Sequence, residues 1–377
     1  MSTMDIIQSL GFSMPMFAAV ICCIMLLMYY RKSDEFTQRK LTRLMIFTYV
    51  MAFFCWFGII LYIVWYNGFV WFNTFFFLVL MLDQVLLYHF VFIITGTESR
   101  RRFYSINYII PVVLTIIMGV WSLLVPYDVQ YYIVESRGEI AEGYTCYSLF
   151  FSATIPVFII YNVLYPLLSL RRILRYRREV VNYSADEQRA SARWLFQLIF
   201  LIWLTLPIAG ITLFVHKSVF FNSAITALGA FLPIFQYLVI CYNSMSGNYV
   251  IIQSPSEEEE QLDEKKKSTP LNRLQFERYI REKKPYLNPK LKITDLCLDL
   301  NTNRSYLSAF INQEYGMNFS RYINCRRLEK LEQLRIDPAN SKTIGIELVM
   351  LAGFSDFRAY LRVKEKEDKM KILKIFE

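Results

Sequence analysis

Residues 293–316, ITDLCLDLNTNRSYLSAFINQEYG, form a polar segment with the periodicity of two short amphipathic helices. We expect the first helix over 293–300 and the second over 304–315, where Gly316 ends it. Asn303 has a side chain that suits the N-cap of the second helix. This pattern predicts a helix-turn-helix unit. The expected buried seam between the two helices consists of Leu296, Leu300, Leu307, Phe310 and Ile311.

The other face of the second predicted helix carries side chains that form hydrogen bonds. Arg304 offers a planar fork of donors, and Ser305, Ser308 and Asn312 are short polar groups. Such groups suit phosphate oxygens and the edges of bases in the major groove of DNA. A solvated protein surface is the alternative use of this face. We therefore treat these residues, with the preceding Asn303, as candidate DNA contacts.

The chain before this segment has a different composition. The protein has 377 residues, of which 55% are hydrophobic and 19% are charged. Soluble domains contain roughly 45–50% apolar and about 25% charged residues. The apolar excess lies almost wholly in residues 1–242, so we expect a membrane domain there and a water-soluble part from residue 243 onward.

Seven apolar runs are long enough to cross a bilayer, which takes roughly 20 residues as a helix. Their predicted bounds are 12–30, 41–66, 69–95, 108–125, 148–170, 194–215 and 220–242. Neither a basic n-region nor a clear cleavage site marks the first run as a cleavable signal. The predicted fold class is therefore all-α, with a seven-transmembrane-helix bundle followed by a helical cytoplasmic domain.

Basic residues in the predicted loops indicate the orientation of the bundle in the membrane. Segments 31–43, 96–107 and 171–193 carry fifteen Lys and Arg residues, whereas the alternate loops carry only Arg137 and Lys217. Because basic loops stay in the cytoplasm, we expect a multi-pass protein of the cell inner membrane with its N-terminus outside and its C-terminal domain cytoplasmic. The aromatic residues near the predicted outer ends, which fit an interfacial belt, are Trp65, Tyr66, Trp71, Trp121 and Tyr127.

Asp83 is the most informative residue within the predicted spans. It lies beside Gln84 near the middle of the third run, in FLVLMLDQVLLYHF. A carboxylate at this depth costs at least about 2.5–3.5 kcal/mol on insertion scales, so it is rarely without a role. The candidate hydrogen-bond partners are Asn162, Gln197 and Gln236. Two roles remain open for Asp83, namely a hydrogen bond that holds two helices together and the sensing of protons or of a ligand.

Several functional classes lack their characteristic residues. Seven cysteines are scattered without a Cys-x-x-Cys pair, and only two histidines are present. We therefore expect no metal site, no disulfide framework and no cofactor. His89 lies six residues from Asp83, about 240° around a helix, so the two do not share a face. The HExxH, GxSG and GxGD patterns are absent and the seventh run holds no lysine, so we expect no enzyme and no retinal protein.

Residues 243–270 have the composition of a charged linker. SPSEEEEQLDEKKKS, at 254–268, places an acidic block before a basic block and has no apolar face, which is typical of flexible chain. After this linker, residues 271–377 hold 21 basic and 14 acidic side chains, a net charge of +7. This excess suits a polyanionic partner such as DNA, although anionic lipid would attract it as well.

Residues 271–377 resemble the DNA-binding domain of the AraC/XylS family of transcription regulators. The first matching stretch is DLCLDLNTNRSYLSAFINQEYGMNFSRYINCRRL at 295–328. The second is IGIELVMLAGFSDFRAYLRVK at 344–364, with the Gly-Phe-Ser of the family at 353–355. The resemblance implies two helix-turn-helix units, joined here by a connecting helix over 319–335. The candidate DNA contacts in these stretches, besides those above, are Arg327, Asp356, Arg358 and Arg362.

The match departs from the family at several positions. Arg362 fits the F-x-R-x-F pattern of the family, but Tyr360 and Lys364 stand at its two aromatic positions. Ile311 and Asn312 replace the usual Phe-Lys, and the Gly-x-Ser/Thr-Pro ending is absent. Arg358 and Arg362 are four residues apart and should therefore share one face of a helix.

The complete arrangement is similar to seven-span, AraC-tailed regulators of Bacteroides-type bacteria. It predicts a membrane-integrated, one-component transcription regulator. The expected partners are double-stranded promoter DNA, the lipid bilayer and an unidentified small-molecule or membrane signal, and a homodimer is a further candidate. Three alternatives stay open: a receptor whose tail binds a protein, a transporter with an accessory domain, and a bundle that serves only as an anchor.

Overall fold

The computed structural model describes residues 3–32, 35–96, 103–136, 138–211, 224–252 and 271–373. These residues are helical and include no strand, and one isolated antiparallel bridge joins Ser184 to Lys292. The predicted all-α class is thus confirmed for the described part of the chain. Most of the predicted linker, from residue 253 to residue 270, lies outside the described residues, as do Arg137 and Lys217.

The chain divides into two compact units. Unit 1 covers Met1–Ile94, Arg101–Ile173 and Arg193–Gly247, and unit 2 covers Thr95–Arg100, Leu174–Ala192 and Asn248–Glu377. The sequence suggested that all of 1–242 forms one domain. The contacts instead group Leu174–Ala192, which lies between the fifth and sixth predicted spans, with the C-terminal residues.

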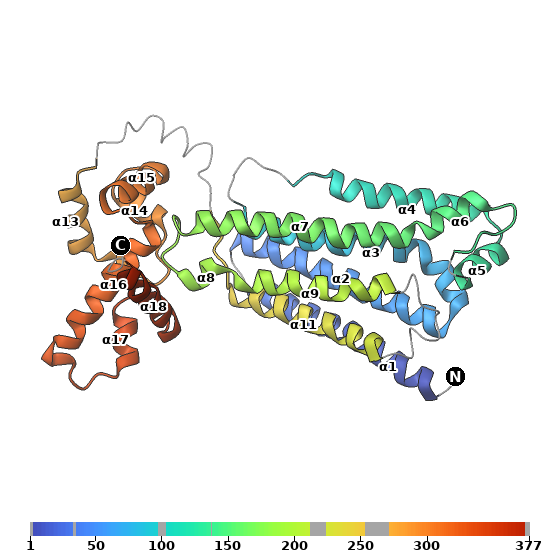
Figure 1. The fold of residues 1–377 in the computed structure, drawn as a ribbon, viewed down its shortest axis with the longest axis horizontal. Coiled ribbons are helices and arrows are strands. Elements are labelled where there is room, and N and C mark those ends of the chain that lie inside the picture. The colour runs from blue at the N-terminus through green and yellow to red at the C-terminus, as the bar shows by residue number, and fades with distance from the viewer. Residues whose placement is uncertain are drawn as a thin grey trace. The chain divides into compact units, whose positions relative to one another are not determined.

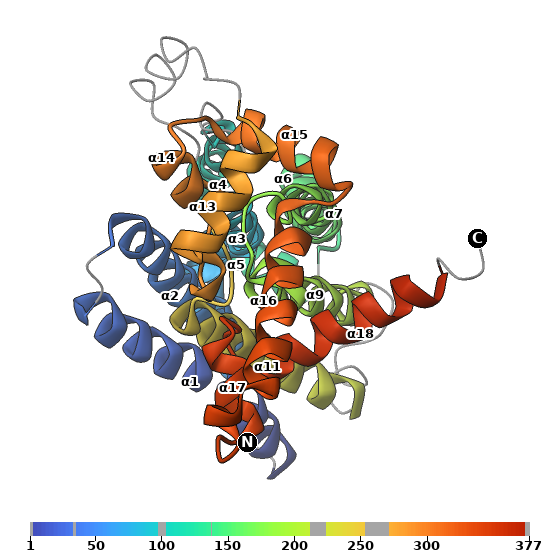
Figure 2. The same ribbon diagram turned by 90° about the vertical axis from the view of Figure 1, so that its left-hand side faces the viewer.

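Unit 1 is a bundle of long apolar helices that run side by side (Figures 1 and 2). Helix α1 packs on α2 and α11, α3 packs on α2 and α4, and α9 packs on α11. The bounds of these helices are α1 Thr3–Lys32, α2 Phe36–Val64, α3 Tyr66–Ile94, α4 Ile106–Leu124, α7 Thr154–Val180 (whose last residues belong to unit 2), α9 Arg193–Ile211 and α11 Ala224–Ser246.

Five helical stretches are long and apolar enough to cross a membrane, among the residues that the structure describes. They are Gly11–Lys32, Phe36–Tyr62, Tyr66–Ile94, Ile106–Leu124 and Thr145–Val180. These stretches coincide with the first five predicted spans. The predicted spans 194–215 and 220–242 contain α9 and α11 but also include undescribed residues, so the total of seven stays a prediction.

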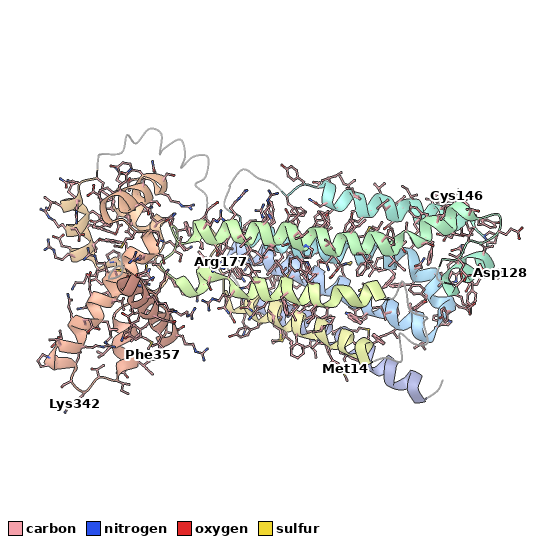
Figure 3. All side chains as sticks on the ribbon, in the orientation of Figure 1. Met14, Asp128, Cys146, Arg177, Lys342 and Phe357 are labelled. Atoms are coloured by element: carbon pink, nitrogen blue, oxygen red, sulfur yellow. The ribbon has the colours of Figure 1, made fainter. Side chains whose placement is uncertain are left out.

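Two parts of unit 1 differ from the expected loops. The fifth predicted span was expected to end at residue 170, but α7 remains helical as far as Val180. The predicted loop between the spans 108–125 and 148–170 contains α5, Tyr127–Glu135, and the first residues of α6, Thr145–Ser152. Helix α5 buries Ile133 and Val134 in two apolar clusters of unit 1. Figure 3 places Asp128 of α5 and Cys146 of α6 at the same end of the bundle.

Unit 2 holds a series of shorter helices. Their bounds are α8 Glu187–Ser191, α13 Arg273–Lys283, α14 Ile293–Asp299, α15 Arg304–Tyr315, α16 Phe319–Ile336, α17 Gly345–Leu351 and α18 Phe357–Leu373. The helices predicted over 293–300, 304–315 and 319–335 are therefore confirmed within one residue. Gly316 has a φ of 64° and ends α15 in the left-handed conformation, as expected of a glycine at this position.

Local capping explains where several of these helices begin. Asn303 Oδ1 accepts a hydrogen bond from the backbone N–H of Tyr306 (2.8 Å), so its predicted N-cap role is confirmed. Asn318 caps α16 in the same way through Arg321 N (2.9 Å). Both contacts lie within three residues along the chain, and the one at Asn303 was predicted from the sequence.

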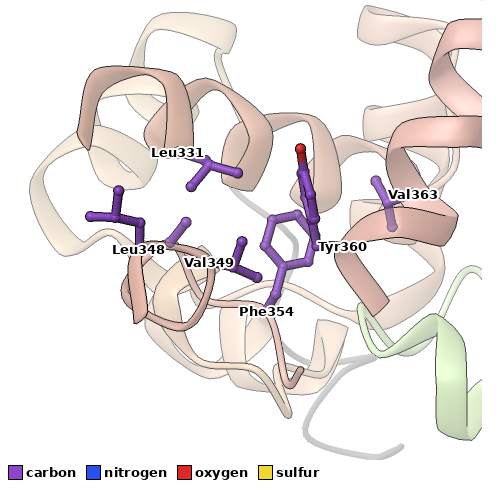
Figure 4. Close-up of a cluster of buried hydrophobic side chains, with 7 residues drawn as sticks. Leu331, Leu348, Val349, Phe354, Tyr360 and Val363 are labelled. Carbon is purple, nitrogen blue, oxygen red and sulfur yellow. The ribbon is translucent and has the colours of Figure 1, made fainter. Parts of the chain in front are cut away.

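Helix α16 contributes to two hydrophobic cores of unit 2. At its first half, Tyr322 packs against Phe276 of α13, with the ring centroids 5.5 Å apart, and Phe276 also contacts Phe310 of α15. At its second half, Leu331 packs with residues of α17 and α18 (Figure 4). The buried members of this second cluster are Leu331, Leu348, Val349, Ala352, Phe354, Tyr360 and Val363. Helix α15 contacts α16 through the first of these cores, and α17 contacts it through the second.

Candidate functional site

The candidate DNA contacts of α15 lie opposite its buried residues. Leu307, Phe310 and Ile311 are buried, whereas Ser305 and Asn312 are exposed. Arg304 and Ser308 are half-buried. The Asn312 side-chain amide donates to the Ser308 carbonyl oxygen at 2.8 Å, which orders it along the helix surface. The helix therefore presents a strip of polar side chains, as its sequence pattern predicted.

Arg304 makes a contact that the sequence did not suggest. The carbon atom of its guanidinium group lies 4.9 Å from the centroid of the Tyr183 ring, a cation–π distance. Tyr183 is fully buried and belongs to the segment Leu174–Ala192 of unit 2. The first residue of α15 is thus supported by an aromatic ring from a distant part of the sequence.

Arg327 is not available to DNA in this structure, which corrects its place among the candidate contacts. Its side chain is only 2% exposed. The guanidinium donates to the carbonyl oxygens of Tyr286 (2.8 Å), Asn288 (2.7 Å) and Ala185 (3.0 Å). It also donates to Asn324 Oδ1 at 2.9 Å. A buried guanidinium with this many acceptors holds backbone segments together, so Arg327 is a structural residue.

The candidates at the second pair of helices have separate roles. Asp356 caps α18, because its Oδ1 accepts from the N–H of Ala359 at 2.7 Å. Arg358 is exposed, and Arg362 Nε donates to the Arg358 carbonyl oxygen at 3.2 Å, one helical turn away. The two arginines therefore follow one side of α18, as their spacing predicted. Tyr360, in contrast, is a buried core residue whose hydroxyl accepts from Arg335 at 3.2 Å.

Ion pairs connect α16 to its neighbours. Arg321 forms two hydrogen bonds with the Glu367 carboxylate of α18, at 2.8 and 2.9 Å. Arg326 pairs with Glu277 of α13 at 2.8 Å and with Glu329 at 2.9 Å. Burial raises the pKa of the neighbouring Tyr322 phenol to about 12, and Arg326 acts in the opposite direction. These arginines are therefore engaged within the protein and are weaker candidates for DNA contact than Arg304 or Arg358.

The candidate intramembrane residues only partly come together. The Gln84 side-chain amide donates to Asp83 Oδ2 at 3.3 Å, within α3. Asn162 donates within its own helix, to the Phe158 carbonyl oxygen at 2.9 Å. Gln236 is buried next to Tyr237 in α11. Asp83 thus bonds to its neighbour in α3, and no described hydrogen bond joins it to Asn162 or Gln236.

Tyr237 is a residue of this region that the sequence analysis missed. The Tyr49 hydroxyl donates to the Tyr237 carbonyl oxygen at 2.7 Å, and Trp56 Nε1 donates to the Tyr237 hydroxyl at 2.9 Å. A tyrosine within an apolar run is not distinctive, so only the three-dimensional contacts identify it. It links α11, the last helix of unit 1, to α2.

Neither a metal site nor a known relative adds to this description. Within the described ranges, no group of three His, Cys, Asp or Glu side chains could hold a metal ion. Comparisons of the sequence with protein-family models, with curated proteins and with solved structures give no match. The resemblance to the AraC/XylS family therefore rests on the residues quoted above.

Proposed function

We propose that this chain is a membrane-integrated, one-component transcription regulator. The apolar helices of unit 1 hold it in the inner membrane and sense a signal. Unit 2 lies in the cytoplasm and binds promoter DNA through two helix-turn-helix units, α14–α15 and α17–α18.

The observation that carries this proposal is the repeated order of helices in unit 2. On each side of α16, a seven-residue helix is followed by a short connection and a longer helix: α14 then α15, and α17 then α18. Helix α16 has 18 residues and so rises about 27 Å. With some lateral offset, that length suits two recognition helices in major grooves about 34 Å apart.

Charge and surface chemistry support the same function. Residues 271–377 carry a net charge of +7, which favours a polyanion. The polar strip of α15 offers a guanidinium, hydroxyls and an amide, which are the groups that bind phosphates and base edges.

Membrane sensing is supported by Asp83 and by the apolar helices. An ionisable side chain within an apolar helix is a candidate for signal detection, because a change in its charge or its partners alters helix packing. Asp83 accepts a hydrogen bond from Gln84 within α3. The exposed Trp65 and Trp71 fit an interfacial position on the outer side, in the orientation expected from the basic loops.

A protein-binding tail is the second candidate function. Unit 2 exposes several large apolar side chains, including Leu274, Leu298, Ile336 and Ile344. Exposed apolar side chains that form a contiguous patch are typical of surfaces that bind proteins rather than DNA. The dependence of binding on salt separates the two candidates, because DNA binding releases counterions and weakens steeply with salt.

Chromatin immunoprecipitation of the tagged full-length protein in its own cells tests the proposal. We expect a few sharp promoter peaks that disappear in the variant Arg304→Ala/Asn312→Ala. A matched control is Arg278→Ala/Gln275→Ala, which likewise removes one arginine and one side-chain amide, from exposed positions of α13. The control should keep the peaks. Absence of enrichment under several growth conditions would favour the protein-binding tail.

A further inference from the structure

The segment Val181–Asp186, which we name the bridging segment, is built into unit 2. Ala185 N donates to the Leu291 carbonyl oxygen at 3.0 Å, and Ile293 N donates to the Tyr183 carbonyl oxygen at 2.9 Å. These two bonds form the antiparallel bridge between Ser184 and Lys292. The bridging segment thus pairs with the chain at the start of α14.

The bridging segment also supplies acceptors to the start of α16. The first N–H groups of a helix have no acceptor within the helix. Val181 O accepts from Ser320 N at 3.0 Å, in the first turn of α16. Tyr183 O accepts from the N–H of Ile293, the first residue of α14. Backbone carbonyls from the chain between the fifth and sixth predicted spans therefore accept hydrogen bonds from the first turns of α14 and α16.

Buried polar groups hold the other side of the segment. Ala185 O accepts from Arg327 Nη1 at 3.0 Å and from Asn324 Nδ2 at 3.3 Å. Arg327, Asn324 and Ala185 are each at most 3% exposed. If the segment left, these buried donors would lose an acceptor in a place that water does not reach freely, which is unfavourable. The contacts are those of a permanent part of the unit.

Tyr183 lies where this segment meets the candidate DNA-binding helix. Its ring is fully buried and faces the guanidinium of Arg304 at 4.9 Å, while its backbone is held by Ile293. A buried ring with a fixed backbone restricts the rotamers of an arginine stacked on it, because the favourable contact exists in only a few of them.

We propose that the bridging segment stays in place when DNA binds and that Tyr183 is a positioning residue for Arg304. This inference rests on the proposed function of unit 2. It makes the stretch between the fifth and sixth predicted spans a determinant of DNA affinity. A guanidinium held in advance at the start of α15 loses less conformational entropy on meeting a phosphate or a base.

A double-mutant cycle on the full chain in nanodiscs tests the positioning role. The readout is the Kd for a labelled mixed-sequence DNA duplex, with the thermal midpoint recorded for each variant. We expect Tyr183→Phe to bind like the wild type, because it keeps the ring. Tyr183→Leu should weaken binding roughly three- to tenfold in the wild-type background. It should have no further effect in an Arg304→Ala background.

A structural role alone predicts a different pattern. Tyr183→Leu would then weaken binding equally in both backgrounds and in proportion to the fall in thermal midpoint. That additive result would overturn the positioning role. A loss of binding in Tyr183→Phe at an unchanged thermal midpoint would also overturn it, because the ring contact is retained there.

A disulfide across the bridge tests whether the segment stays in place. Ser184 and Lys292 face each other in the bridge as a non-hydrogen-bonded pair. In such a pair the two Cα atoms lie about 4.5 Å apart, which is within the range that a disulfide spans. The variant Ser184→Cys/Lys292→Cys is made with Cys297→Ser and Cys325→Ser, and the same background without the pair is the control. We expect the cross-link to form and the oxidised protein to bind the duplex like the reduced protein.

The outcomes of the cross-link separate this inference from the proposed function. If oxidation forms the disulfide but abolishes duplex binding, the segment must leave for DNA and the inference fails while the proposed function stands. If the disulfide does not form, the bridge is absent in solution and the inference fails as well. If the wild-type protein shows no salt-dependent duplex binding, the proposed function itself fails.

Discussion

The guanidinium of Arg327 donates a hydrogen bond to the carbonyl oxygen of Ala185, and these residues are 142 positions apart in the sequence. The contact joins α16 to the bridging segment inside unit 2. The family resemblance implies that Arg327 contacts DNA. In the structure, its side chain is instead buried and holds backbone segments together. Four acceptors surround the group, so its removal affects several backbone segments at once.

Replacing Arg327 should destabilise unit 2. In Arg327→Ala, the carbonyl oxygens of Tyr286, Asn288 and Ala185 lose a charged donor, and we expect a loss of about 3 kcal/mol or more. Arg278→Ala, at an exposed position of α13, should change stability by less than about 0.5 kcal/mol. Hydrogen exchange of unit 2 amides in the full chain measures both. Equal protection in the two variants would contradict the structural role.

Gly353 should not tolerate a side chain. Its φ is +95°, and a Cβ there would overlap the Tyr286 carbonyl oxygen and lie 2.7 Å from the Leu287 Cα. Both neighbours are backbone atoms, so Gly353→Ala should cost about 2 kcal/mol or more. Gly345→Ala is the matched control, because nothing lies within 4 Å of a Cβ at that position. Thermal unfolding of the two variants should show a lower midpoint only for Gly353→Ala.

Arg304 and Arg358 should differ in how they affect DNA binding. A residue that contacts only phosphate lowers affinity for all sequences and reduces the slope of log Kd against log salt by about 1 when it is replaced. A base contact costs about 1–3 kcal/mol on the preferred sequence alone. We expect Arg304→Ala to weaken binding to every duplex, with a further loss on the preferred sequence, and Arg358→Ala to show the uniform loss alone. Titrations of specific and random duplexes at several salt concentrations distinguish the two, and identical profiles would contradict this assignment.

Asp83→Asn should abolish the response to the signal while leaving the fold of the protein intact. The amide keeps the shape of the side chain and one acceptor for Gln84, so the protein should still accumulate in the membrane. It cannot carry a charge, so we expect promoter occupancy to become independent of growth condition. Chromatin immunoprecipitation under several conditions measures this. Unchanged regulation would indicate that Asp83 only holds helices together, whereas a loss of transport with intact regulation would favour the transporter alternative.

Local features made much of unit 2 predictable. The bounds of α15 follow from Asn303 and Gly316, which act on neighbouring residues, and the polar strip of α15 follows from helical spacing. The first five apolar stretches were predictable because membrane length and composition are also local properties. Helix α5 was missed because its nine residues are too short to show a clear period and are stabilised by contacts with distant apolar residues.

Contacts between distant segments could not be predicted in this way. Tyr183 and Ala185 lie in a stretch whose many arginines suggested only a cytoplasmic loop. Their partners Arg304 and Arg327 look like ordinary surface residues of polar helices in the sequence. The contacts of Tyr237 with Tyr49 and Trp56 were equally hidden, because these residues are unremarkable in apolar runs.

The bridging segment bears on how the protein is made and how it could be cut. The ribosome synthesises Ala185 well before Arg327, so unit 2 can finish folding only after the intervening helices α9 and α11 have been synthesised. A protease that cut the chain between Gly247 and Leu271 would free a C-terminal fragment without Tyr183 and Ala185. In such a fragment, the backbone N–H groups of Ile293 in α14 and Ser320 in α16 would lack the acceptors that Tyr183 and Val181 supply. If the proposed function holds, release of a soluble activator by proteolysis is therefore disfavoured, and promoter regulation from the bilayer is expected.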